Sequence, residues 1–334
     1  MGNLMTKNRT KSPPVVVFAN QKGGVGKTTL TVHAAWMAAE AGLKTLLIDM
    51  DGQGNASRTI LGKEALGFVA KVREEARKGG SEKQGIEQIL ISSDLVLYDL
   101  ESINLRALTG PPGLDMIPAF VNDQVLADCM RREIEVIPRP RNNLNHFLSK
   151  YGNDYDLILI DSPPQLGNLQ SASIAMATDV VIPINVSGFA LDGVRGMLPT
   201  LATIRDAYNP ELRISGILTN MYNRRSLSAQ ETQQELITQY PDAVIPYEIG
   251  VRSSLDAAVY KGMPIWYQRR TGSALTASKE VTEALAETLA RTSLNENVIE
   301  RWKVGTKKYR FNYATTSNRV IQAIQQRLSP EEIS

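Results

Sequence analysis

A glycine-rich stretch near the N-terminus carries the residue types that bind phosphate. Glycines let backbone N–H groups approach a phosphate without a Cβ in the way, and a helix that follows adds the positive end of its dipole. In such loops a lysine, here Lys27, reaches the β- and γ-phosphates of a nucleotide, and a hydroxyl, here Thr28, binds Mg²⁺. The stretch therefore predicts a nucleoside-triphosphate site, and the competing interpretation is a chance glycine loop. Its residues are Asn20, Gln21, Lys22, Gly23, Gly24, Val25, Gly26, Lys27, Thr28 and Thr29.

Aspartates that could work beside this loop follow two other predicted strands. Residues 45–48 lead to Asp49 and Asp51, and the apolar run 157–160 leads to Asp161. In open α/β sheets, ligands bind at the carboxyl ends of the strands. Asp161 is therefore predicted to hold Mg²⁺ through water, Asp51 to position an attacking water, and Asp49 to support the metal shell. The alternatives are an Asp/Gly turn and a buried strand that ends in a capping aspartate.

The elements that must position these side chains alternate between short apolar runs and longer amphipathic ones. This alternation predicts the α/β class, with a doubly wound, mainly parallel sheet flanked by helices and a C-terminal helical extension. Strands are expected at 15–19, 45–48, 114–118, 156–160, 180–184, 212–218 and 243–246. Helices are expected at 30–41, 63–78, 122–135, 142–150 and 274–292, and one opens near 190.

Composition excludes several classes of protein. The chain has 334 residues, 43% of them hydrophobic, and a formal net charge of only +2, so a nucleic-acid surface would have to be a local patch. The single cysteine, Cys129, allows no disulfide framework and fits a reducing cytoplasm. No apolar run approaches the length of a membrane span. The two histidines, His33 and His146, are far apart in sequence and favour no metal site.

The glycine loop departs from the usual pattern, because Gln21 stands where a glycine is expected and Lys22 directly precedes the glycines. In this form it resembles the deviant P-loop of the ParA/MinD ATPases. Further stretches in matching order support the resemblance, which runs from about residue 15 to residue 264. They are residues 49–55, 161–164, 187–193 and 257–264.

The resemblance implies roles for individual residues. Lys22 would cross a dimer interface to the partner's nucleotide and act in catalysis with Lys27 and Asp51. Two loops would flank the adenine, and their arginines, Arg225 and Arg252, would lie on the face that contacts DNA; an ordinary solvated surface is the alternative for each. The family usually has Pro-Arg where this chain has Pro246-Tyr247. The implied nucleotide contacts are Lys22, Gly23, Gly24, Val25, Gly26, Lys27, Thr28, Thr29, Met221, Pro246 and Tyr247.

The function implied by the resemblance is slow, partner-stimulated ATP hydrolysis, with Mg²⁺, that drives partition of a plasmid or chromosome. ATP would join two subunits into a homodimer that binds non-specific double-stranded DNA, and a ParB-like centromere-binding protein would trigger hydrolysis. This predicts a cytoplasmic, nucleoid-associated protein without membrane binding. The alternative is a MinD-like or cargo-positioning ATPase that works on a membrane or protein scaffold. A metabolic P-loop ligase or kinase is less favoured, because Lys22 implies that a partner subunit fills the space beside the γ-phosphate.

The predicted domain organisation is a flexible arm at 1–14, an ATPase domain at 15–292 and an extension at 293–334. Residues 62–113 form an enlarged variable region within the ATPase domain, with no assigned task. The extension interleaves basic and aromatic residues between Trp302 and Phe311, which suits either nucleic-acid binding or, as we favour, docking on the body. Apolar positions at 320–328 share one helical face, and packing or dimerisation fits them better than membrane binding.

Overall fold

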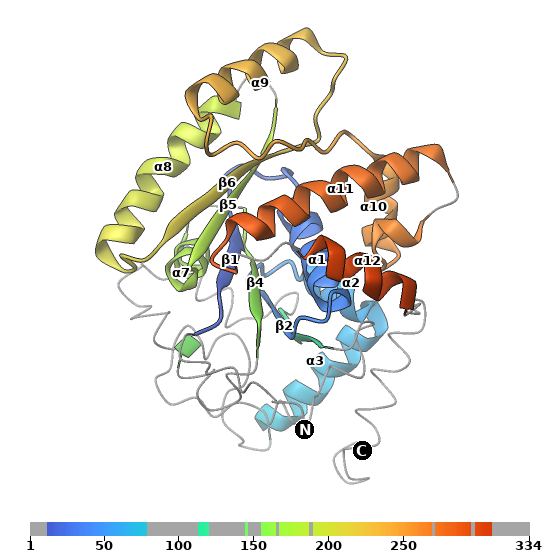
Figure 1. Ribbon diagram of the computed structural model, residues 1–334. Helices are drawn as coiled ribbons and strands as arrows, with labels where there is room; N and C mark the ends of the chain where they lie inside the picture. The colour runs from blue at the N-terminus through green and yellow to red at the C-terminus, as the bar shows by residue number, and fades with distance from the viewer. Residues whose placement is uncertain are drawn as a thin grey trace, which may run out of the picture.

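The chain folds around one parallel sheet in the computed structural model, which describes residues 12–78, 113–119, 144–145, 155–164, 167–186, 190–268, 271–294 and 298–308. The strand order is β3-β2-β4-β1-β5-β6, and all neighbouring pairs are parallel (Figure 1). The strands are β1 Val15–Phe18, β2 Thr45–Asp49, β3 Leu114–Ile117, β4 Leu157–Asp161, β5 Asp179–Asn185 and β6 Arg213–Asn220. The described helices are α1 Lys27–Glu40, α2 Asn55–Leu61, α3 Lys63–Lys78, α7 Asn168–Met176, α8 Ala190–Ala207, α9 Leu227–Gln239, α10 Ser253–Tyr260, the 3-10 turn η3 Ile265–Tyr267, α11 Gly272–Arg291 and α12 Ile299–Lys308.

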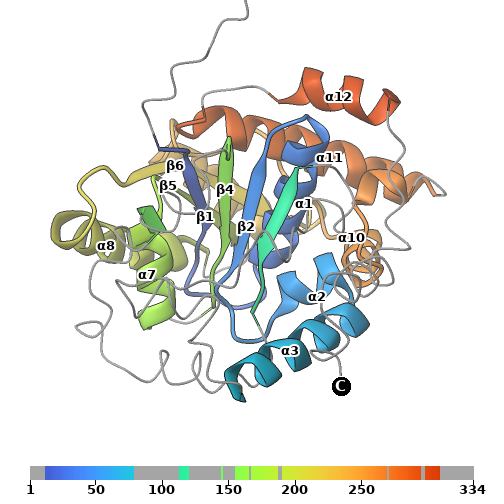
Figure 2. The ribbon, with the colours of Figure 1, turned by 90° about the horizontal axis from the view of Figure 1, so that it is seen from below.

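Helices cover both faces of the sheet, as a doubly wound fold requires. Side chains alternate along each strand, so Val16 and Phe18 join the core under α1, α2, α10, α11 and α12, whereas Val15 and Val17 join the core under α7, α8 and α9. Figure 2 shows these two layers on either side of the strands. The chain winds outward in opposite directions from the middle of the sheet, and the loop after β1 lies where the strand order reverses. Ligands bind at this switch point in open α/β sheets.

Most predicted elements are confirmed, with small shifts at their ends. The helix expected at 63–78 is α3, and the helix expected at 30–41 begins earlier, at Lys27, because Gly26 adopts a left-handed conformation with φ 87° and ends the loop. The strand predicted at 243–246 is wrong. Val244 makes only an isolated bridge to Ile217, and Pro246 has no N–H to extend the ladder.

The beginning of the C-terminal extension docks on the body, as predicted. Trp302 on α12 is buried, and its indole N–H donates to Glu40 Oε2 at 2.9 Å; the indole of Trp266 donates to the same oxygen at 2.9 Å. The two indoles also meet edge to face. Arg301 adds a hydrogen bond from its Nε to the Ala41 carbonyl. The extension is therefore anchored at the C-terminal end of α1, the helix that begins at the glycine loop.

His33, on α1, connects the glycine loop with that anchor. Its Nδ1 lies 2.7 Å from the Thr29 carbonyl oxygen, and its Nε2 accepts from the Ile265 backbone N–H at 3.2 Å. Burial lowers the pKa of His33 to about 4, so the ring is neutral, with the proton on Nδ1. His33 is thus a buried structural group, and both of its ring nitrogens are engaged with the backbone.

Several sequence predictions lie outside the described residues. These are the arm before residue 12, residues 79–112 of the variable region, the helix at 122–135 with Cys129, most of the helix at 142–150 with His146, Phe311, and the apolar face at 320–328. Among the helices that the structure describes, none is both long and apolar enough to cross a bilayer.

Candidate functional site

The glycine loop connects β1 to α1 in a conformation that only glycine adopts easily. Gly24 and Gly26 have φ of 72° and 87°. A Cβ on Gly26 would collide with the side-chain amide of Asn220, which donates from Nδ2 to the Val25 carbonyl at 2.9 Å. At the start of the loop, the Lys22 N–H donates to Asn20 Oδ1 at 2.8 Å, which forms a tight turn. The loop is therefore fixed by asparagines at both ends, a role that the sequence pattern alone did not reveal.

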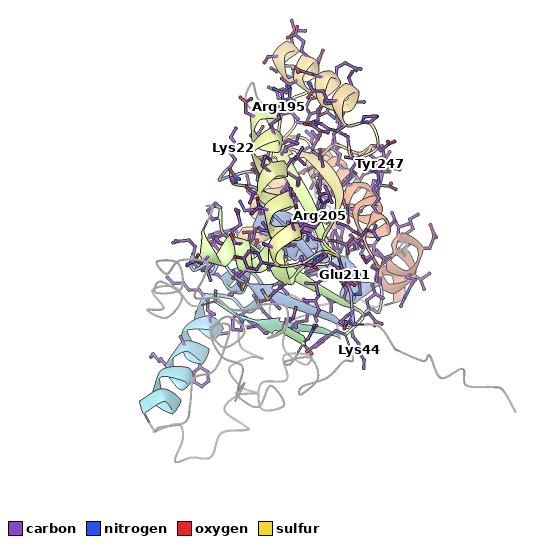
Figure 3. The ribbon with its side chains drawn as sticks, turned by 90° about the vertical axis from the view of Figure 1, so that its left-hand side faces the viewer. Lys22, Lys44, Arg195, Arg205, Glu211 and Tyr247 are labelled. Carbon is purple, nitrogen blue, oxygen red and sulfur yellow. The ribbon has the colours of Figure 1, made fainter. Side chains whose placement is uncertain are left out.

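The ammonium group of Lys27 lies against the backbone of this loop. Its Nζ donates to the carbonyls of Asn20 at 3.0 Å and Lys22 at 3.3 Å, and the side chain is buried. Burial lowers the pKa of Lys27, whereas the nearby carboxylates of Asp161 and Asp51 act to raise it. The site thus holds a cation of the kind that binds phosphate oxygens. Lys22, by contrast, lies at the surface (Figure 3).

The predicted carboxylates converge beside Thr28. The Thr28 hydroxyl donates to Asp161 Oδ2 at 2.8 Å, and β2 and β4 run side by side with Asp49 paired to Asp161 in register. Asp161 Oδ1 is buried and has no hydrogen-bond partner among the described residues. Asp51 is also buried, and its Oδ1 accepts from the Gln53 N–H at 3.0 Å. Asp49, Asp51 and Asp161, which come from two separate stretches of the sequence, thus lie at the same edge of the sheet.

Asp49 is committed to holding the start of α2. Its Oδ2 accepts from the Ser57 N–H at 2.9 Å and from the Ser57 hydroxyl at 2.7 Å, and its Oδ1 accepts from the Asp51 N–H at 3.1 Å. Ser57 Oγ also accepts from the Ala119 N–H, so it links β3 to the same cluster. A metal would therefore meet Asp49 only indirectly. Sequence reasoning gave no role to Ser57, which lies eight residues from Asp49 and just beyond the motif at 49–55.

The electrostatics of this cluster favour a bound cation. Burial, and secondly the charge of Asp49, raise the pKa of Asp161 well above its usual range; burial also raises the pKa of Asp49 to about 6. The unpartnered Asp161 oxygen and the Thr28 hydroxyl are hard oxygen ligands of the type that Mg²⁺ prefers. No group of three acidic, His or Cys side chains within the described chain could hold an ion alone. The residues therefore fit a magnesium ion that takes its other ligands from water and phosphate.

Two loops join this site from β6 and from the segment before α10. Met221, directly after Asn220, has a left-handed φ of 55°, a conformation uncommon outside glycine. The next residue, Tyr222, donates its N–H to the Ile249 carbonyl at 2.9 Å, so the loop after β6 is fastened to the segment 246–252. Pro246 and Tyr247 lie on the surface of this segment, with Tyr247 38% exposed. The structure thus brings the loops that were predicted to flank the base next to each other, and it places the loop after β6 next to the glycine loop.

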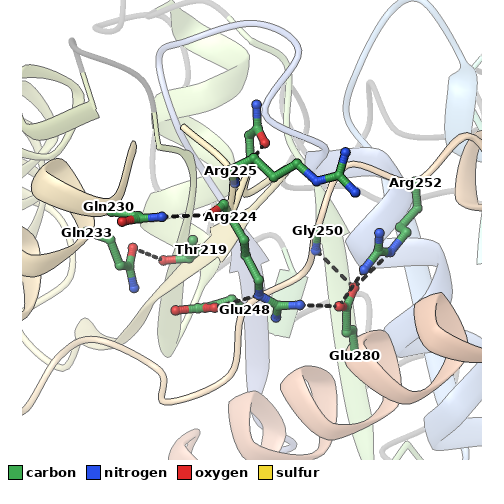
Figure 4. Close-up of polar contacts among 10 residues, drawn as sticks. Thr219, Arg224, Arg225, Gln230, Gln233, Glu248, Gly250, Arg252 and Glu280 are labelled. Atoms are coloured by element: carbon green, nitrogen blue, oxygen red, sulfur yellow. Dashed lines mark hydrogen bonds and ion pairs between the residues drawn. The ribbon is translucent and has the colours of Figure 1, made fainter. Parts of the chain in front are cut away.

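The two arginines predicted to contact DNA differ in their surroundings. Arg225 is exposed and makes no ion pair within the described residues. Arg252 is mostly covered, and its guanidinium donates to both carboxylate oxygens of Glu280 on α11, at 2.8 and 3.2 Å. Arg224, which the sequence did not single out, donates to the same glutamate at 2.8 Å (Figure 4). Only Arg225 therefore offers an uncommitted positive charge in this cluster.

A hollow of about 680 Å³ adjoins the glycine loop on the side of Thr28 and Thr29. It lies between α2 and α10, and its wall includes Arg58 and Lys261 as well as Tyr260, which is 93% exposed. Its wall includes no residue of the loops 220–222 and 246–252 that were predicted to flank the base. It was not predicted, because its wall comes from segments about 200 residues apart.

Comparison with known proteins agrees with this geometry. Residues 14–214 match the model of the family described as AAA domain. The chromosome-partitioning ATPase Soj from Treponema pallidum is 34% identical over 272 residues, which are 81% of this chain and 96% of Soj. Among solved structures, the ATP complex of a Cyanothece McdA variant aligns with a TM-score of 0.60 at 17% identity, over 84% of this chain and 97% of McdA. The septum site-determining protein MinD of Pyrococcus horikoshii, in complex with Mg-ADP, aligns with a TM-score of 0.54 at 20% identity, over 82% of this chain and 95% of MinD.

Proposed function

The chain belongs to the ParA-type partition ATPases, and from this premise we propose that it binds ATP with Mg²⁺ and hydrolyses it to drive partition of a DNA molecule. The observation that carries the proposal is the convergence of Lys27, Thr28 and Asp161 at one end of β1 and β4. This is a cation for phosphate beside an oxygen pair for magnesium. Soj, the relative with 34% identity, is itself named a chromosome-partitioning ATPase.

Each residue of the site has one task in this proposal. The N–H groups of the loop and Lys27 bind the phosphates, and Thr28 and Asp161 would hold the metal. When bound, magnesium would neutralise charge on the β- and γ-phosphate oxygens. Asp51 orients the attacking water, because its carboxylate follows β2 at the same sheet edge. Asp49 keeps Asp51 and α2 in place through its bonds to the Asp51 N–H and to Ser57.

The proposal extends to a switch between two assemblies. Lys22 lies at the surface, as needed if its ammonium serves the nucleotide of a second subunit in an ATP-bound homodimer. That dimer would bind non-specific double-stranded DNA, and thereby the nucleoid, through Arg225. Arg252, the other predicted contact, would add to this only if Glu280 released it. A ParB-like centromere-binding protein would stimulate an otherwise slow hydrolysis and so release the DNA.

Two substitutions in the site test the proposal. Lys27→Ala should abolish ATP binding, because the charge on the β- and γ-phosphates is lost. Asp51→Ala should retain ATP affinity but hydrolyse about 10²–10⁴-fold more slowly, since it removes an orienting group. Isothermal titration with ATP and Mg²⁺ and a phosphate-release assay measure the two effects. Asp206→Ala, an aspartate that is 74% exposed on α8, is the matched control. Undiminished ATP affinity in Lys27→Ala would refute the site.

A second experiment separates partition from the scaffold alternative. Pelleting with anionic phospholipid vesicles and with plasmid DNA, each with and without ATP, compares binding to a membrane with binding to DNA. Partition predicts ATP-dependent DNA binding that falls with salt, because phosphate contacts release counterions. ATP-dependent pelleting with vesicles and none with DNA would reverse the proposal in favour of a MinD-like protein.

A further inference from the structure

Glu280 on α11 gathers two arginines and one backbone N–H from the two loops beside the glycine loop (Figure 4). Arg224, from the loop after β6, donates to Oε1 at 2.8 Å, and Arg252 donates to Oε1 and Oε2 at 2.8 and 3.2 Å. The Gly250 N–H donates to Oε2 at 3.0 Å. Both oxygens of a single carboxylate therefore hold segments that are separated by more than twenty residues.

The fixed position of Glu280 comes from its helix. Its side chain is 9% exposed, and its neighbours Ala277, Val281 and Ala284 belong to the core under α11. Burial acts to raise the pKa of Glu280, but the hydrogen bonds from Arg252, Gly250 and Arg224 outweigh it and hold the pKa below its usual value. The carboxylate is thus charged at neutral pH. If it moved away, the two arginines would lose their buried counter-charge.

From Glu280 the contacts continue to the glycine loop. The Gly250 segment is bridged to Tyr222, and Tyr222 lies two residues after Asn220, whose side chain donates to Val25 of the loop. The hydrogen bond from the Tyr222 N–H to the Ile249 carbonyl joins the two loops directly. A shift of Arg224 or Arg252 would therefore reach the glycine loop through residues 220–222.

Charge in the cluster is balanced apart from Arg225. Glu280 and Glu248 offset Arg224 and Arg252, since Arg224 Nε also lies 3.3 Å from Glu248 Oε2. Arg225 is next to Arg224 in sequence but is exposed and has no ion-pair partner within the described part of the chain. Arg224 and Arg252 thus make ion pairs within the protein, whereas Arg225 presents its charge at the surface.

We propose that Glu280 is a positioning residue for nucleotide binding: it clamps the two base-flanking loops through Arg224 and Arg252, and so leaves Arg225 as the arginine for DNA. This inference rests on the proposed function, because it assigns the loops to the base of ATP. Without the clamp, the loops take the binding-competent arrangement for only part of the time, and the apparent Kd rises by the inverse of that fraction.

Glu280→Gln tests the clamp with little change in side-chain size. The Gln side chain keeps one acceptor oxygen, but its NH2 group only donates and so cannot accept a hydrogen bond from Arg224 or Arg252. If Glu280→Gln lowers the fraction of molecules with binding-competent loops to about one in ten, the Kd for ATP–Mg²⁺ and the KM rise about tenfold. The rate at saturating ATP should change much less than KM, because Lys27, Thr28 and Asp51 do not touch Glu280. Glu283→Gln, which breaks the exposed Lys279–Glu283 pair on the same helix, should leave the Kd as in the wild type.

The readouts are isothermal titration with ATP–Mg²⁺ and steady-state phosphate release. Wild-type affinity in a folded Glu280→Gln variant, or an equal fall in kcat with unchanged KM, would overturn the inference. If that variant does not fold, Arg252→Gln replaces it, because Glu280 then keeps Arg224 and Gly250; it should weaken ATP binding in the same direction, and unaltered affinity would overturn the clamp. Failure of the wild type to bind ATP would instead refute the proposed function.

Discussion

The buried histidine on α1 makes the stability of the protein sensitive to acid. The pKa of His33 falls from 6.5 to about 4 on burial, so the unfolded chain binds a proton between those values that the folded chain rejects. Stability is therefore lost as the pH falls through this window, and the two pKa values give a loss of about 2 kcal/mol between pH 7 and pH 5. Urea unfolding of the wild type and of a variant without the imidazole, followed by far-UV circular dichroism at pH 7, 6 and 5, measures this contribution as a difference.

His33→Gln isolates the contribution of the imidazole. The amide oxygen can still accept from the Ile265 N–H, but no titrating group remains. The variant loses the edge-to-face contacts with Trp36 and Trp266, so its stability at pH 7 will be lower, and the readout is how its stability changes with pH. Asp49 works in the opposite sense, because its pKa is raised to about 6 and its stabilising proton is lost as the pH rises. The wild-type profile alone is therefore shallow, and the comparison must be between variants.

The expected result is a stability difference between wild type and His33→Gln that is about 2 kcal/mol larger at pH 7 than at pH 5. Trp36→Phe is the matched control, because it alters the same aromatic packing without removing the titrating ring. Its profile should run parallel to the wild type. Parallel profiles for His33→Gln and wild type would show that the imidazole is not held neutral, and the reasoning from burial would be wrong.

Three further substitutions probe other parts of the molecule. Lys22→Ala should bind ATP as a monomer if its ammonium serves a neighbouring subunit, and a dimer by light scattering would contradict this. Arg225→Ala should reduce the slope of log affinity for DNA against log salt by roughly 2 in a dimer, because each subunit loses one phosphate contact; an unaltered slope would place the DNA surface elsewhere. Trp302→Phe should cost about 1.5–3 kcal/mol in urea unfolding, since the donor to the charged Glu40 is lost, and an unchanged midpoint would mean that α12 is not anchored there.

The docking of Trp302 also determines how the basic-aromatic tail can be tested as a DNA site. Truncation after Thr292 would remove α12 and the second indole donor to Glu40, so any loss of DNA binding could come from damage to the core. Truncation after Lys308 keeps the anchor and removes only the segment beyond it. Full DNA binding by the chain that ends at Lys308 and also carries Lys303→Ala, Lys307→Ala and Lys308→Ala, together with a loss in Arg225→Ala, would assign the DNA surface to the arginine loop.

The local parts of the site could be predicted because their signals are short in sequence. The glycine loop, Thr28 and the aspartates after β2 and β4 each follow a hydrophobic run, and parallel strands bring their ends to one edge. The helix at 63–78 was found by its amphipathic pattern alone. The strand expected at 243–246 failed because Pro246 has no N–H to continue the ladder, which leaves only the isolated bridge between Val244 and Ile217.

The partners that hold the site in place could not be predicted, because they are distant in sequence. Glu280 lies 56 residues from Arg224 and 28 from Arg252, and on the sequence it is one of several glutamates on an ordinary helix face. Glu40 is similar: it lies 226 residues from Trp266 and 262 from Trp302. Such contacts depend on the tertiary fold, and no periodicity or motif distinguishes these acids from solvated ones.

The arrangement of internal bonds indicates that nucleotide binding exchanges partners within a loop that is already formed. Lys27 donates to two carbonyls of its own loop, and Thr28 donates to Asp161, so the groups proposed for phosphate and magnesium are held in place by the protein itself. Asp161, whose pKa burial and Asp49 raise, must lose any proton before it can serve a metal. Because the loop geometry is fixed by Asn20 and Asn220, little chain ordering opposes binding. The two loops that Glu280 holds are fastened by the protein in the same way, through the hydrogen bonds from Arg224, Gly250 and Arg252.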